Sequence, residues 1–175
     1  VDARWAGAAW AVEGAGSFWR GWRQRRRLAR AFALCLQGAA GLAFLHGLHG
    51  AQDTVLSGAP LGALMLGVAL LFSHRQLRLA DPQHTSIWER RCLPVLACAG
   101  LGFLYLIAPL NFTAEVTSIC WALAGVVTLV LGLRIQSRSF LFSAFAVQLL
   151  GGGLFLLQLD TADGAAGGVL SAGWR

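Results

Sequence analysis

The sequence predicts an all-α protein, a polytopic bundle of about six transmembrane helices that contains a parallel hairpin repeat. Three observations predict it: the composition, the six long apolar stretches and the placement of the arginines. Hydrophobic residues make up 57% of the 175 residues and charged residues 13%, whereas a soluble domain has about 45–50% apolar and about 25% charged residues. A soluble domain of this size leaves much of its surface in water. We therefore expect lipid to surround the chain.

The first prediction concerns the helices themselves. A helix needs roughly 20 apolar residues to cross the hydrocarbon layer, and six stretches meet or approach that length. They lack the alternation of a barrel strand, and unpaired backbone groups are costly in lipid, so helices are expected. The stretches cover residues 5–21, 31–48, 54–72, 92–110, 117–133 and 140–159.

The first stretch is the least typical of the six. Glu13 lies near its middle, where a carboxylate costs a few kcal/mol, and the stretch holds few large aliphatic residues. Two alternatives follow. Either this helix inserts with the help of the second, or residues 10–30 lie along the membrane interface.

The connections alternate between arginine-rich and arginine-free. All fourteen basic residues are arginine, and twelve lie after the first, third and fifth stretches. Cytoplasmic loops carry such an excess, which predicts a multi-pass protein of a bacterial inner membrane. It also predicts a polar cytoplasmic loop at residues 73–91 and places both termini of this segment outside. The twelve are Arg20, Arg23, Arg25, Arg26, Arg27, Arg30, Arg75, Arg78, Arg90, Arg91, Arg134 and Arg138.

The arginines also bear on partners. The first cluster, from Arg20 to Arg30, orients the hairpin and could hold anionic lipid headgroups, at about 1 kcal/mol per charge. Nucleic acid is not expected, because a basic patch needs a soluble face to present it. The chain forms a single transmembrane region over residues 1–175. Because it begins without Met and ends just after an apolar stretch, we expect it to belong to a longer protein whose other helices are its partners.

Two parts of the sequence match each other. Residues 10–48 align without gaps to residues 121–159, and twelve of the 39 positions are identical. Apolar composition alone does not readily place Trp, Arg and Gln in register, so the unit is a helical hairpin repeated in parallel. The matches include Trp10/Trp121, Gly14/Gly125, Gly21/Gly132, Arg23/Arg134, Arg27/Arg138, Gln37/Gln148, Gly41/Gly152 and Phe44/Phe155.

The first copy also carries a family resemblance. Its Trp-Ala-x-Glu-Gly opening at residues 10–14, its Gly-x-Arg turn at Gly21 and Arg23, and its Gln-x-x-x-Gly at Gln37 and Gly41 resemble a bacterial family of multi-spanning predicted membrane proteins, domain of unknown function 2339. The resemblance implies repeated hairpins in a long inner-membrane chain and no established activity. The second copy has Ala124 where the first has Glu13.

The candidate intramembrane residues are Glu13, Gln37 and Gln148. The first two fall near mid-membrane on neighbouring predicted helices and could share a hydrogen bond. They serve either as polar glue between helices or as part of a proton or ion pathway. Gln148 repeats the position of Gln37 without the acid, which favours glue.

The candidates at the outer face are His46, His49 and Asp53. The two histidines stand three residues apart, so their rings share one helix face, as a metal site requires. A third reliable ligand is not evident, and histidines at the interface without a metal are the favoured interpretation. No metal or cofactor is therefore predicted.

No catalytic residue can be assigned. The sequence has no Lys and so no phosphate-binding loop of the Walker type. Other catalytic signatures are missing too. The favoured function is an integral inner-membrane protein of structural or transport-like type and not an enzyme. The alternative is a membrane-embedded cell-envelope enzyme acting on a lipid-linked substrate. Close helix contacts are expected at Gly58-x-x-x-Gly62, Gly100-x-Gly102 and Gly151-Gly152-Gly153.

Overall fold

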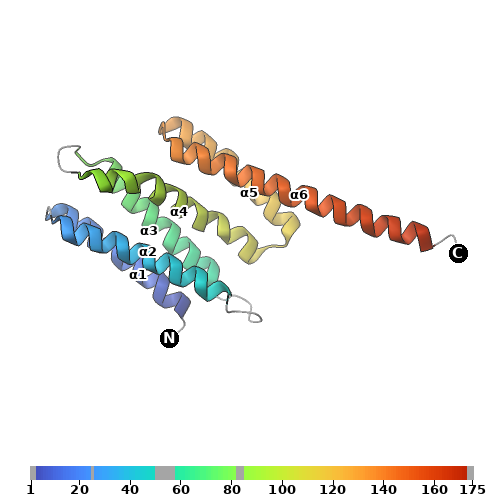
Figure 1. The fold of residues 1–175 in the computed structure, drawn as a ribbon, viewed down its shortest axis with the longest axis horizontal. Helices are drawn as coiled ribbons and strands as arrows, with labels where there is room; N and C mark the ends of the chain where they lie inside the picture. The colour runs from blue at the N-terminus through green and yellow to red at the C-terminus, as the bar shows by residue number, and fades with distance from the viewer. Residues whose placement is uncertain (1–2, 25, 50–57, 82–84, 173–175) are drawn as a thin grey trace. The chain divides into compact units, whose positions relative to one another are not determined.

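The computed structural model describes residues 3–24, 26–49, 58–81 and 85–172, with side chains described for 9–24, 26–48, 58–81 and 85–157. In these residues the regular structure is entirely helical, which confirms the all-α fold (Figure 1). There are six helices: α1 (Ala3–Arg23), α2 (Arg27–His49), α3 (Ala59–Arg78), α4 (Ile87–Asn111), α5 (Ala114–Arg134) and α6 (Arg138–Ala172).

The helices are longer than the apolar stretches that predicted them. α3 continues through polar residues to Arg78, and α4 already begins at Ile87, so helix covers most of the polar segment at residues 73–91. α6 likewise continues beyond residue 159 to Ala172. Polarity limits where a helix can lie in lipid, but it does not end the backbone hydrogen bonding of the helix. The predicted start of the third stretch, residues 54–57, lies outside the described residues.

Four helices in the described part of the chain are long and apolar enough to cross a membrane: α2, α4, α5 and α6. α1 and α3 fall short of that criterion. α1 contains Glu13 and many small residues, and the last turns of α3 are polar, from Ser73 to Arg78.

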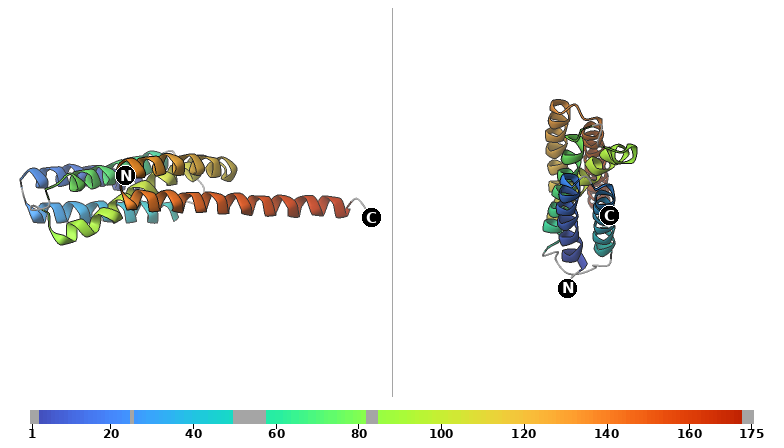
Figure 2. Two further views of the ribbon diagram at one scale, coloured as in Figure 1. Left: turned by 90° about the horizontal axis from the view of Figure 1, so that it is seen from above. Right: turned by 90° about the vertical axis from the view of Figure 1, so that its left-hand side faces the viewer.

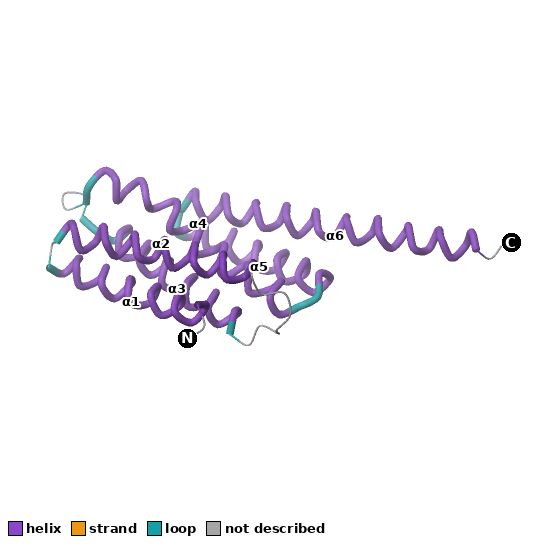
Figure 3. The backbone as a smooth tube through the Cα atoms, turned by 60° about the horizontal axis from the view of Figure 1, so that its bottom comes forward, coloured by secondary structure: helices purple, strands orange, loops and turns teal. Residues whose placement is uncertain are grey.

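The chain divides into two compact units. The first, Val1–Asn111, contains α1 to α4. In it, α1 packs against α2 and α3, α3 packs against α4, and α2 makes a smaller contact with α3. The second unit, Phe112–Arg175, contains the α5–α6 hairpin. Figures 2 and 3 show the α1–α2 and α5–α6 hairpins as antiparallel helix pairs, each joined by a short turn.

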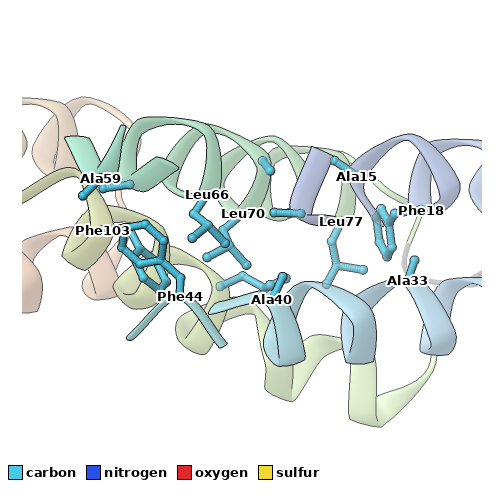
Figure 4. Packing of buried hydrophobic residues seen from close by; sticks show 14 residues of the cluster. Ala15, Phe18, Ala33, Ala40, Phe44, Ala59, Leu66, Leu70, Leu77 and Phe103 are labelled. Atoms are coloured by element: carbon cyan, nitrogen blue, oxygen red, sulfur yellow. The ribbon is translucent and has the colours of Figure 1, made fainter. Parts of the chain in front are cut away.

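The core of the first unit combines small residues with a few aromatic rings (Figure 4). Ala33 and Ala40 of α2 are fully buried, and Phe44 meets Phe103 of α4 edge-on with ring centroids 5.9 Å apart. Gly62 of α3 makes room for this aromatic pair, because a Cβ at Gly62 would lie 2.7 Å from the Phe44 ring. Small residues therefore allow the helices to approach closely.

Glycines also bring α3 and α4 together. A Cβ at Gly67 would lie 2.9 Å from the carbonyl oxygen of Gly100, so neither position can carry a larger residue without displacing a helix. The expected close contacts therefore occur at Gly62 and Gly100. At Gly102, Gly152 and Gly153 an added Cβ would meet nothing within 4 Å, so these three glycines make no close contact.

Candidate functional site

A buried ion pair joins the starts of α2 and α4. Arg30 Nε lies 3.1 Å from Glu89 Oε1, and the two side chains are only 3% and 0% exposed. The ion pair bridges the first turns of the two helices. Removing one partner of a buried pair leaves an uncompensated charge, so the pair fixes the spacing of these helix ends.

Glu89 is further held by the start of its own helix. Its Oε2 accepts hydrogen bonds from the Ser86 backbone N–H at 2.8 Å and from the Ser86 hydroxyl at 2.7 Å. A Ser three residues before a Glu is the capping-box signature of a helix N-terminus. That signal stands in the sequence at residues 86–89, within the segment predicted as a polar loop, and it could have located the start of α4.

Tryptophan rings of α1 pack against two arginines near the ion pair, Arg30 and Arg23. The Arg30 guanidinium lies 4.5 Å from the ring centre of Trp22 in α1, and Arg23 lies 4.8 Å from that of Trp19. Such cation–π contacts are worth most when they are desolvated, as at the buried Arg30. Trp22, Arg30 and Glu89 therefore tie α1, α2 and α4 together; we call these three residues the arginine clamp.

Gln37 forms a second polar contact inside the first unit. Its side chain is fully buried, and its Nε2 donates to the Ser73 hydroxyl of α3 at 2.8 Å. A Cβ at Gly14 of α1 would lie 2.8 Å from Gln37 Cγ, so the amide packs directly on a glycine. Gln37 Oε1 has no hydrogen-bond partner among the described residues. The contact joins three helices as polar glue.

The other intramembrane candidates lie apart from this contact. Glu13 is exposed on α1, so the hydrogen bond considered between Glu13 and Gln37 is replaced by the one from Gln37 to Ser73. Gln148 is half-buried in the second unit, where its Cγ would lie 2.7 Å from a Cβ at Gly125. This packing has the same form as that of Gln37 on Gly14.

The outer-face candidates are only partly described. His46 is exposed on α2, whereas the His49 side chain and all of Asp53 lie outside the described residues. No group of three His, Cys, Asp or Glu side chains gathers within the part that is described. Sequence reasoning passed over His74, which is buried on α3 with its Nδ1 3.0 Å from the Leu93 carbonyl oxygen of α4.

A groove of about 360 Å³ runs between α2 and α4 above α3. Residues 34–45 of α2 and 92–103 of α4 line its sides, and Leu70 of α3 contributes to its lining. The lining is almost wholly hydrocarbon. Gln37 is among the lining residues, but its side chain is fully buried. α2 and α4 contact each other at the two ends of the groove, through the arginine clamp at one end and the Phe44–Phe103 pair at the other. Between these contacts α2 presents glycines at Gly38 and Gly41.

The predicted lipid-binding arginines do not form one set. Arg20, Arg23, Arg26 and Arg27 are exposed, and Arg30 is buried in the arginine clamp. Arg25 lies outside the described residues.

Comparisons of the chain with protein-family models, with characterised proteins and with solved structures found no match.

Proposed function

We propose that this chain is an integral, multi-spanning protein of a bacterial inner membrane whose role is structural, with all six helices crossing the bilayer. The observation that carries the proposal is the outward apolar surface of the long helices. Phe32 and Leu42 of α2, Val95 of α4 and Leu149 of α6 are between 64% and 77% exposed. A soluble monomer rarely presents continuous apolar patches of this kind, whereas lipid accommodates them.

The arginine-bearing connections support the proposed topology. The arginine clamp links the start of α2 to the start of α4, so the α1–α2 and α3–α4 connections lie at the same end of the first unit. Arg26 lies in the first connection, and Arg78 and Arg90 flank the second. Such an excess of arginine is typical of the cytoplasmic side. The segment then has both termini outside.

The packing of α1 favours a span over a helix lying on the surface. Ala11 and Phe18 of α1 are fully buried, and α1 packs against both α2 and α3. A helix lying in the interface would not run alongside its neighbours in this way. Glu13 is then an exposed acid on a lipid-facing or partner-facing side.

The polar contacts favour a structural role over a transport-like one. A pathway needs ionisable groups that face one another or a water-filled cavity. Gln37 instead bonds Ser73, Glu13 lies apart from it, and the groove beside α2 is lined by hydrocarbon. The enzyme alternative has His46 as its only described residue, so no observation favours it.

The hairpin repeat and the family resemblance belong to the same proposal. Gly14 and Gly125 share two equivalent neighbours, Gln37/Gln148 and Ala33/Ala144. The neighbours of Gly21 and Gly132 are also equivalent. These matches support a duplicated hairpin at residues 10–48 and 121–159. Kinship with the multi-spanning family of domain of unknown function 2339 rests on the motif residues of that hairpin.

Reporter fusions test the topology. A reporter active only outside the membrane is placed after each helix in turn, and its cytoplasmic counterpart at the same positions serves as the control. We expect the outside reporter to be active after α2, α4 and α6, and the inside reporter after α1, α3 and α5. Failure to alternate, or a purified chain that stays monodisperse in buffer without detergent, would overturn the proposal.

A further inference from the structure

We propose that the groove between α2 and α4 binds one acyl chain of an anionic glycerophospholipid from the cytoplasmic leaflet, with its phosphate held by Arg27 and Arg91. The inference rests on the proposed membrane location and goes beyond it, because it assigns a defined lipid site.

The groove has the dimensions of one lipid chain. The lining residues of α2 run from 34 to 45 and those of α4 from 92 to 103, so each wall is about 16 Å long at 1.5 Å per residue. That is close to half of the roughly 30 Å hydrocarbon layer, which is the depth of one leaflet. The volume of about 360 Å³ falls within the range of small-molecule sites.

The position of the groove selects the leaflet. Leu34 comes seven residues after the start of α2, and Cys92 comes five residues after the start of α4. The groove therefore opens about 10 Å from the arginine-bearing end of each helix. Under the proposed topology this end is cytoplasmic, so the groove reaches from just below the cytoplasmic headgroups to the middle of the bilayer.

Exposed arginines precede both walls of the groove along the chain. Arg27 lies seven residues before Leu34 and Arg91 four residues before Val95, so each shares the helix face of a lining residue. Both arginines are exposed. The acid nearest along the chain, Glu89, is neutralised in the arginine clamp by Arg30. The two exposed arginines therefore complement a phosphate, and Trp88, 39% exposed, can take the headgroup level that indole rings prefer.

The lining excludes a ligand that needs polar contacts deep in the groove. Gln37 is the main polar residue there, and it is fully buried and bonded to Ser73. Gly38 presents open space, since a Cβ there would meet nothing within 4 Å. An unbranched hydrocarbon chain fits such a surface, and the charge at the mouth selects its headgroup.

Binding of fluorescent phospholipids to the full chain in detergent micelles tests the proposal. Phosphatidylglycerol is compared with phosphatidylcholine of the same acyl chains. Two arginines at about 1 kcal/mol each predict a preference of roughly tenfold or more for the anionic lipid. The double variant Arg27→Gln/Arg91→Gln should abolish the preference. The matched control Arg134→Gln/Arg138→Gln, which removes two arginines from the second hairpin, should retain it.

A second variant tests the acyl-chain site. Gly38→Phe fills the groove from a position with free space and should weaken binding of both lipids at least tenfold, whereas Gly16→Phe, equally unobstructed on α1, should not. Equal binding of the two lipids, or a preference that survives Arg27→Gln/Arg91→Gln, would overturn the site. So would full binding by Gly38→Phe. If the topology reporters alternate as expected and any of these binding results is obtained, only the lipid site is refuted. The proposed membrane location is then still supported.

Discussion

The α1–α2 and α5–α6 hairpins share one turn and one way of packing. In the first turn the Arg26 N–H donates to the Gly21 carbonyl at 3.0 Å, and in the second the Ser137 N–H donates to the Gly132 carbonyl at 3.0 Å. In the second turn Gln136 has a φ of 48°, and its backbone N–H donates to the Leu133 carbonyl. This hydrogen bond completes a Schellman motif. Both turns bring a glycine against the following helix.

The hairpins differ where the first one meets α3 and α4. Phe44 is fully buried, but its counterpart Phe155 is 52% exposed. A Cβ at Gly41 would lie 3.2 Å from Phe103, but one at Gly152 would meet nothing. Arg30 of the arginine clamp corresponds to Leu141 in the second hairpin.

This difference divides the residues of the hairpins into two groups, those shared by both hairpins and those found in only one. The contact within each hairpin uses shared residues: Gly14 packs on Gln37, and Gly125 packs on Gln148. Arg30, which only the first hairpin carries, forms the ion pair with Glu89 of α4, and Trp22 packs on Arg30. The comparison therefore predicts that Gly14 and Gly125 are similarly sensitive and that clamp positions are sensitive in the first hairpin alone.

The largest expected effect comes from Arg30→Leu, which gives the first hairpin the residue of the second. It leaves Glu89 buried without its cation and should lower the free energy of unfolding by about 3–5 kcal/mol. Thermal or chemical unfolding in detergent micelles measures it. Arg30→Leu/Glu89→Leu should recover most of the loss, because no charge then remains buried.

The control for this prediction is Arg26→Leu, which removes an exposed arginine and should change stability by no more than about 0.5 kcal/mol. If Arg30→Leu were as mild as Arg26→Leu, the ion pair would not hold the ends of α2 and α4 together.

A medium loss of unfolding free energy is expected at Gly14 and Gly125, two equivalent glycines that pack within their hairpins. Gly14→Leu and Gly125→Leu each place atoms where Gln37 or Gln148 already lies, and such overpacking costs about 1–3 kcal/mol. The same unfolding measurement should give similar losses for the two variants. Gly16→Leu and Gly152→Leu, at unobstructed positions, should be nearly neutral. A large loss in one hairpin with none in the other would refute a common packing unit.

The sequence alone predicted the helices well because helix formation in lipid depends on length and apolarity, which are local properties. It also singled out Gln37 as a polar residue of an apolar helix, and such a lone amide must find a partner. It did not give the partner: Ser73 lies 36 residues away on α3, and no pattern within one helix encodes that register.

The arginine clamp was missed for a related reason. Arg30 looked like one more member of a basic cluster, and Glu89 like part of a polar loop. Only the packing of α2, α3 and α4 buries both side chains and brings them to 3.1 Å. The capping box at residues 86–89 would have extended α4 and moved Glu89 from the loop to the first turn of a helix, which is the one local signal that pointed toward the clamp.

The smallest expected effect is a coupling energy between Gln37 and Ser73 that Gln148 should not show. Ser73→Ala removes the acceptor of the Gln37 amide, whose Oε1 already lacks a partner among the described residues. Hydrogen bonds between membrane helices average about 0.6 kcal/mol, so a double-mutant cycle of Gln37→Leu and Ser73→Ala should give a coupling near that value.

The same cycle with Gln148→Leu in place of Gln37→Leu should give no coupling, because Gln148 packs on Gly125 within the other hairpin. A coupling above about 2 kcal/mol for Gln37 would exceed the largest value found for such bonds in a membrane protein. It would mean that Ser73 does more than accept one hydrogen bond. The amide would then belong to a larger polar network, and the interpretation of Gln37 as simple glue between α2 and α3 would have to be replaced.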